Sequence, residues 1–149
     1  MSDAEIIVVP FTMEHLQEIP LRGCVQDRVD MMDLSIRMMK KQGYWGYTAL
    51  LDNRVAAIGL VMRSPSDPGT DGIASIFLAP AAREKPLQIV RLAKKYLPLM
   101  ARSLGLRRLY ATVTAEWLKW IRVMGFQEVA TVPNPFDEIE LVTLCVREF

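Results

Sequence analysis

The most informative stretch for the fold, Ile73 to Phe126, reads IASIFLAPAAREKPLQIVRLAKKYLPLMARSLGLRRLYATVTAEWLKWIRVMGF. Its first segment, Ile73–Ala79, is an apolar run that predicts a buried strand ending at Pro80. The next long segment, Leu87–Leu104, carries apolar residues at helical spacing and basic residues on the opposite face. The stretch therefore predicts a buried strand that leads into a long amphipathic helix.

Segments typical of strands and of helices lie on both sides of this stretch, and the whole sequence predicts the order β-α-α-β-β-β-α-β-α-β-β. A mixed sheet with helices on both faces, an α/β fold, accommodates this order. The other predicted segments are a strand at Ile6–Thr12, helices at Met13–Ile19 and Asp27–Gln42, a hairpin of Tyr44–Leu51 and Val55–Met62, a loop at Ser64–Gly72, a strand at Arg108–Val113, a helix at Ala115–Met124, and strands at Gln127–Val132 and Ile139–Arg147.

Length and composition bound the class of protein. The chain has 149 residues, which predicts a single domain over residues 1–149. With 18 basic and 17 acidic residues, the net charge of +1 offers no field to attract nucleic acid or an anionic membrane, and no apolar run is long enough to span one. Cys24 and Cys145 indicate reduced thiols in a cytoplasmic protein. A single histidine, His15, excludes the usual His-rich metal sites, so we expect no metal.

Three motifs between Ile73 and Phe126 resemble those of a known protein family. They are the strand end FLAP at Phe77–Pro80, the arginine Arg83 in the following loop, and the phrase WIRVMGF at Trp120–Phe126. In position and order they resemble the GNAT (GCN5-related N-acetyltransferase) superfamily. The resemblance covers nearly the whole chain in element order, and it implies a GNAT-like mixed sheet and acetyl-CoA as the family's acyl donor.

The loop that binds the cofactor pyrophosphate in this family is altered. The resemblance implies backbone N–H groups at a helix N-terminus, with glycines that let the phosphates approach. Here Pro86 stands at the first glycine position and has no N–H, while Glu84 adds negative charge. We therefore expect a degraded acetyl-CoA site and no cofactor. If acetyl-CoA binds through this atypical loop, the residues expected to contact it are Leu78, Arg83, Lys85 and Gln88.

The catalytic positions of the family are altered as well. The tyrosine that many members use as general acid corresponds to Ile121, which has no proton to donate. The predicted strand Ile73–Ala79 lacks the carboxylate that many members use as general base, and Thr114 stands where an asparagine often follows. The catalytic residues are therefore unknown, and the candidate substitutes are Ser75, Tyr44, Tyr47, Tyr110 and Glu116.

Two hypotheses follow. The first is a non-catalytic structural or assembly protein, since the chain's length and lost glycine loop are similar to small internal-virion or assembly proteins of short-tailed bacteriophages. It would act in the host cytoplasm or the virion and bind a protein partner or a second copy through adaptable methionines or large tryptophans. The alternative is an active GNAT N-acetyltransferase. The candidate partner-binding residues are Met31, Met32, Met38, Met39, Trp117 and Trp120.

Overall fold

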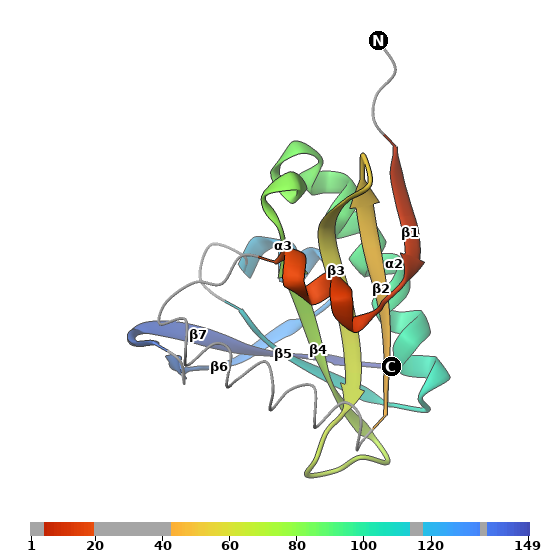
Figure 1. The fold of residues 1–149 in the computed structure, drawn as a ribbon. Helices are drawn as coiled ribbons and strands as arrows, with labels where there is room; N and C mark the ends of the chain where they lie inside the picture. Colours follow the sequence, from red (N-terminus) through yellow and green to blue (C-terminus); the bar gives the residue numbers. More distant parts are fainter. Residues whose placement is uncertain (1–4, 20–42, 114–117, 135–136) are drawn as a thin grey trace.

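The computed structural model describes residues 5–19, 43–113, 118–134 and 137–149. In these ranges seven strands form one sheet in the order β1-β2-β3-β4-β5-β7-β6 (Figure 1). All neighbouring strands are antiparallel except β4 and β5, which are parallel. The strands are β1 (Ile6–Pro10), β2 (Tyr44–Leu51), β3 (Arg54–Arg63), β4 (Asp71–Leu78), β5 (Arg108–Val113), β6 (Gln127–Asn134) and β7 (Asp137–Glu148).

The helical elements lie on both faces of this sheet. The 3-10 helix η1 (Met13–Glu18) covers one face, and α2 (Pro86–Ser103) covers the opposite face (Figure 1). A short α3 (Leu118–Val123) packs on the same face as α2, since both contribute to one buried cluster. A second 3-10 helix, η2 (Pro80–Glu84), connects β4 to α2. The predicted α/β class, a mixed sheet with helices on both faces, is confirmed.

Helix α2 follows from its sequence. Pro86 occupies the first helical turn, where the missing N–H breaks no helical hydrogen bond. Pro98 lies inside the helix and is buried. Gly105 follows the last turn with a φ of 71°, a left-handed conformation that ends helices. The face toward the sheet is apolar and buried, and its residues are Ile89, Val90, Ala93, Leu97, Met100 and Ala101.

Several predicted boundaries differ from the structure. The predicted helix Asp27–Gln42 lies outside the described residues, and Ala115–Met124 is described only from residue 118 onward, as α3. Strand β4 begins at Asp71, inside the predicted loop. Two neighbouring residues of β4 pack on opposite faces of the sheet: Ile76 packs on the face of α2, and Phe77 does not. Because side chains alternate along a strand, Phe77 packs half-exposed on the face of η1 instead. No helix in the described ranges is long and apolar enough to cross a membrane.

Candidate functional site

The candidate site is an opening in the sheet between β4 and β5. The two strands pair only at their first residues, where Asp71, Gly72 and Ile73 face Arg108, Leu109 and Tyr110. The Asp71 carboxylate accepts hydrogen bonds from Arg108 Nε at 2.9 Å and from Nη2 at 3.3 Å. Nearby, the Thr70 carbonyl accepts the backbone N–H groups of Arg107 and Arg108. These contacts hold the strands together at one end, here called the closed end, and beyond it the strands separate.

The separation leaves one edge of β4 without a strand partner. Ala79 N donates to Ala56 O at 2.9 Å, and Ser64 N donates to Asp71 O at 2.8 Å, so the odd-numbered residues of β4 point their backbone groups toward β3. In an antiparallel pair this direction alternates from residue to residue. The N–H and C=O groups of Ile76 and Leu78 therefore point toward the opening. Polar backbone groups in such a position favour a ligand that can pair with them.

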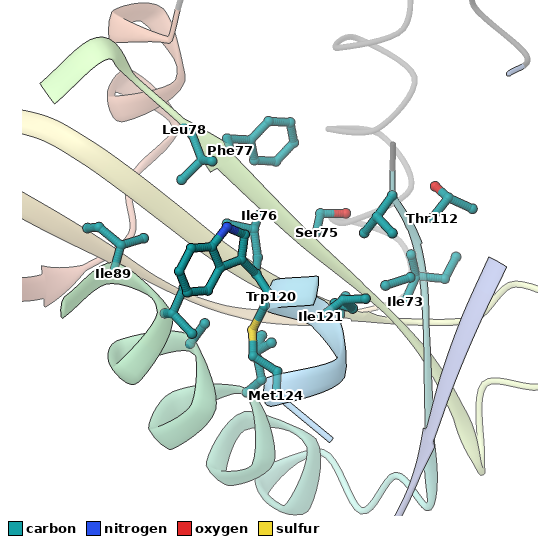
Figure 2. Close-up of a pocket in the computed structure, with 16 residues that line it drawn as sticks. Ile73, Ser75, Ile76, Phe77, Leu78, Ile89, Thr112, Trp120, Ile121 and Met124 are labelled. Carbon is teal, nitrogen blue, oxygen red and sulfur yellow. The ribbon is translucent and has the colours of Figure 1, made fainter. Parts of the chain in front are cut away.

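A cavity of about 380 Å³ occupies the opening on the side of α2 and α3. The side chains that line it are apolar apart from Ser75, Thr112 and the indole N–H of Trp120 (Figure 2). Consecutive residues of β4 line it although their side chains alternate between the faces, because the sheet itself is open there. Its apolar lining includes Ala74, Ile76, Leu78, Ala93, Leu97, Ala111, Ile121 and Met124.

Trp120 was predicted to lie on a partner-binding surface. In the structure it is half-buried and lines the cavity, and Figure 2 shows its indole between Ile76 of β4 and Ile89 of α2. Its role as a partner-binding residue stays a prediction. The other residues assigned to that surface, Met31, Met32, Met38, Met39 and Trp117, lie outside the described residues.

The four predicted cofactor contacts occupy different parts of the site. Leu78 lines the cavity, Arg83 is exposed on η2, Lys85 is the N-cap of α2, and Gln88 is exposed in its first turn. Ile89 N already donates to Lys85 O at 3.1 Å. Because Pro86 has no N–H, the donors left at this helix start are the backbone N–H groups of residues 87 and 88.

Glu84 was expected to place negative charge where the diphosphate would lie. In the structure its carboxylate accepts a hydrogen bond from Arg54 Nη2 at 3.3 Å. Arg54 begins β3, so the contact joins η2 to the β2–β3 hairpin, where Asp52 also lies 4.0 Å from Arg54. The charge of Glu84 is thus partly compensated by Arg54.

The candidate acid and base residues do not gather at the cavity. Ile121 is buried in its lining. Of the substitutes, only Ser75 contributes to the lining, Tyr44 and Tyr110 are half-buried elsewhere, and Glu116 lies outside the described residues. Tyr47 is buried in the core, and burial, with a smaller effect of Tyr96, raises the pKa of its phenol. Tyr47 therefore stays protonated near neutral pH.

His15 does not contribute to the lining of the cavity. His15 lies on η1, on the other face of the sheet from α2, and its Nδ1 is 2.6 Å from Thr48 Oγ1 and accepts the N–H of Thr12 at 3.1 Å. Within the described ranges, no group of three or more His, Cys, Asp and Glu side chains could hold a metal ion.

Solved structures with the same fold are numerous. An acetyltransferase from Streptococcus agalactiae is 13% identical over 97% of this chain and 98% of its own, with a TM-score of 0.71. A GNAT-family acetyltransferase from Streptococcus pneumoniae is 14% identical over 97% and 99%, with a TM-score of 0.69. The protein yncA from Salmonella typhimurium, solved with its cofactor acetyl-CoA, is 15% identical over 96% and 93%, with a TM-score of 0.69.

These comparisons establish that the chain has the fold of GNAT acetyltransferases. The sequence matches no protein-family model and no curated protein. The comparison with yncA corrects the prediction that the chain uses no cofactor, because that structure of the same fold contains acetyl-CoA. None of the names of these three proteins refers to a phage or a virion.

Proposed function

We propose that the chain is an N-acyltransferase that takes an acyl group from acetyl-CoA or a related acyl-CoA and transfers it to an amine. The observation that carries this proposal is the apolar cavity along the unpaired edge of β4, in a fold shared with acetyltransferases. A fold alone assigns no activity, so the proposal depends on how well this cavity suits the donor.

The described residues fit an acyl-CoA donor in two ways. The amide groups of the pantetheine arm would pair with the backbone of Ile76 and Leu78, as an added strand pairs with a sheet edge. The pyrophosphate would meet the start of α2, where the helix dipole and two free N–H groups favour an anion. Arg83 and Lys85 flank that position and add positive charge.

An acyl-CoA supplies a thioester whose C–S bond breaks as the amine nitrogen bonds to the carbonyl carbon, and the amine proton passes to the departing thiolate, directly or through water. The protein's part in this exchange is to orient the reactants and exclude water. The described lining contains no side chain that ionises near neutral pH. We therefore expect the rate to rise with pH as the acceptor amine loses its proton.

This proposal replaces the assembly hypothesis as the main one. The structures of the same fold support the acyltransferase alternative, and Trp120 lines the cavity. Binding of a protein partner or a second copy, a phage origin and a cytoplasmic location stay predictions.

Titration calorimetry with CoA and acetyl-CoA tests the proposal. We expect dissociation constants in the micromolar range, about −8 kcal/mol, and a constant weaker than about millimolar would refute it. The variant Ile76→Pro removes the backbone N–H that points into the opening but none that bonds to β3. It should bind about two- to tenfold more weakly than the matched control Ile76→Ala, which keeps that N–H.

A further inference from the structure

The indole of Trp120 brings a hydrogen-bond donor to the cavity on the side of α2 and α3. Trp120 lies in α3, is half-buried, and lines the cavity together with Ile76 and Leu78 of β4. Figure 2 shows the indole nitrogen on the edge of the ring that faces β4. An indole N–H donates a hydrogen bond and cannot accept one. The apolar lining therefore receives a neutral donor that does not titrate.

This donor has no protein acceptor within the described ranges, where none of the side-chain hydrogen bonds involves Trp120. Other contacts hold the residue in place. Lys119 Nζ lies 4.7 Å from the centroid of the indole ring, a cation–π contact, and the Trp120 carbonyl accepts the N–H of Met124 at 3.1 Å. Neither contact uses the indole N–H. A donor left without a partner in an apolar lining favours a ligand that brings an acceptor.

A second donor points into the opening beside the indole. The backbone N–H of Ile76 is directed away from β3, and Figure 2 shows the Ile76 side chain next to the indole of Trp120. Both side chains pack against the same core cluster. The opening thus contains, around Ile76, one backbone donor and one side-chain donor that come from different elements. A carbonyl oxygen has two lone pairs and can accept from both.

We propose that the indole N–H of Trp120, together with the N–H of Ile76, donates a hydrogen bond to the thioester carbonyl oxygen of the bound acyl-CoA. This assignment rests on the proposed function and gives one named side chain a part in the transfer. When the amine nitrogen bonds to the carbonyl carbon, an electron pair moves onto this oxygen, and it returns as the C–S bond breaks. Two donors aimed at the oxygen stabilise its charge, and an apolar surrounding strengthens their effect.

The order of groups along the donor agrees with this assignment. Strand β4 runs from the closed end toward η2 and the start of α2, so Ile76 lies farther than Leu78 from the proposed pyrophosphate position. In an acyl-CoA the thioester follows the two amides of the pantetheine arm, counted from the pyrophosphate. With those amides paired along Leu78 and the carbonyl of Ile76, the next donor along the edge is the N–H of Ile76, because the N–H precedes the C=O within a residue.

The test is a calorimetric titration of the full chain and of the variant Trp120→Phe with acetyl-CoA and with CoA, which has no thioester carbonyl. The variant should bind acetyl-CoA about two- to tenfold more weakly and CoA less than about twofold more weakly. Equal weakening of both ligands overturns the inference, because the indole would then contact the shared arm, and so does an unchanged affinity for both. Failure of the unchanged protein to bind either ligand refutes the proposed function itself.

Infrared spectroscopy reads the same hydrogen bond without depending on a variant. Acetyl-CoA with a heavy-isotope carbonyl carbon should show its carbonyl stretch at a lower frequency when bound to the unchanged protein than when free. In Trp120→Phe the stretch should return part of the way, since the N–H of Ile76 remains. A stretch that does not move on binding, or that moves equally in both proteins, overturns the inference.

Two control variants separate the donor from the size of the ring. Ile89→Val trims a lining side chain and removes no donor, so it should change the affinities for CoA and acetyl-CoA by the same factor. Trp45→Phe removes an indole N–H from an exposed residue of β2 outside the lining, and it should change neither affinity. A selective loss of acetyl-CoA affinity in Ile89→Val would mean that cavity size causes the effect, and it would overturn the inference.

Discussion

The closed end and the open end of the β4–β5 pair use the same two strands for opposite purposes. At the closed end, a two-point ion pair between Asp71 and Arg108 and paired backbone groups hold the strands together. At the open end, Ile76 and Leu78 pair with β3 but have no partner on β5, and side chains of α2 and α3 cover the space between the strands. The difference shows that the site is a gap in the sheet, and that this gap depends on firm pairing of the same two strands beside it.

The largest expected effect is a difference between the two ends in how much stability a truncated side chain removes. Leu109 is fully buried at the closed end, so Leu109→Ala should lower the free energy of unfolding by about 2–5 kcal/mol. Val113 is half-buried at the open end of the same strand, and Val113→Ala should cost clearly less. Chemical denaturation of both variants measures the difference. Equal losses would contradict the view that the closed end holds the sheet together.

A second prediction concerns Gly72→Ala, a substitution that adds one carbon atom at the closed end. A Cβ placed on Gly72 would contact Leu106 Cδ1 and lie 3.0 Å from both Leu109 Cδ2 and the Met62 carbonyl oxygen. The carbonyl belongs to backbone and cannot move freely, so Gly72→Ala should cost about 1–3 kcal/mol of stability.

Gly69→Ala is the matched control for Gly72→Ala. It adds the same atom in the preceding loop, where nothing lies within 4 Å of the new Cβ. Thermal unfolding should show a lower melting temperature for the Gly72 variant only. An unchanged melting temperature for that variant would mean that the strands can move apart at the closed end without loss.

The sequence predicted the elements that form this site better than it predicted the site itself. Helical spacing located α2 to within a residue at each end, and Arg108–Val113 was predicted with the boundaries of β5. The start of β4 was predicted as part of the loop Ser64–Gly72, because Asp71 and Gly72 are residue types typical of turns. Their strand conformation depends on pairing with β5, which is distant in the sequence. Pairing between distant segments leaves no local periodicity to detect.

The cavity could not be predicted for a related reason. Ala74, Ala93 and Ala111 lie far apart in the sequence, and each alone is typical of an ordinary core position. Spacing on a short helix does not say which face meets the sheet, so it could not show that Trp120 lines the cavity. The missing glycines and tyrosine also led to the prediction of no cofactor. The unpaired β4 backbone, however, needs no particular side chain to pair with a ligand.

A third prediction sharpens the comparison at the open end. Pro86→Ala adds one N–H donor to the first turn of α2, where an anion would gain a hydrogen bond. Acetyl-CoA affinity should rise about two- to tenfold in calorimetry. Leu87→Ala is the control, since it changes an exposed side chain in the same turn and leaves the N–H donors as they are. A gain in both variants, or in neither, would argue against pyrophosphate binding at this turn.

The smallest expected effect concerns charge at the same end. Arg83 is exposed and Lys85 half-exposed, so each should strengthen acyl-CoA binding only about two- to fivefold at low salt. Arg83→Ala and Lys85→Ala should lose this contribution, and at about 1 M salt, where the screening length falls to about 3 Å, they should match the unchanged protein. Arg102→Ala, which removes the same charge at the far end of α2, should bind normally at every salt concentration. If the affinity of the Arg102 variant fell as much as that of the Arg83 variant, the effect would come from the overall charge of the protein. That result would contradict binding of the phosphates at the start of α2.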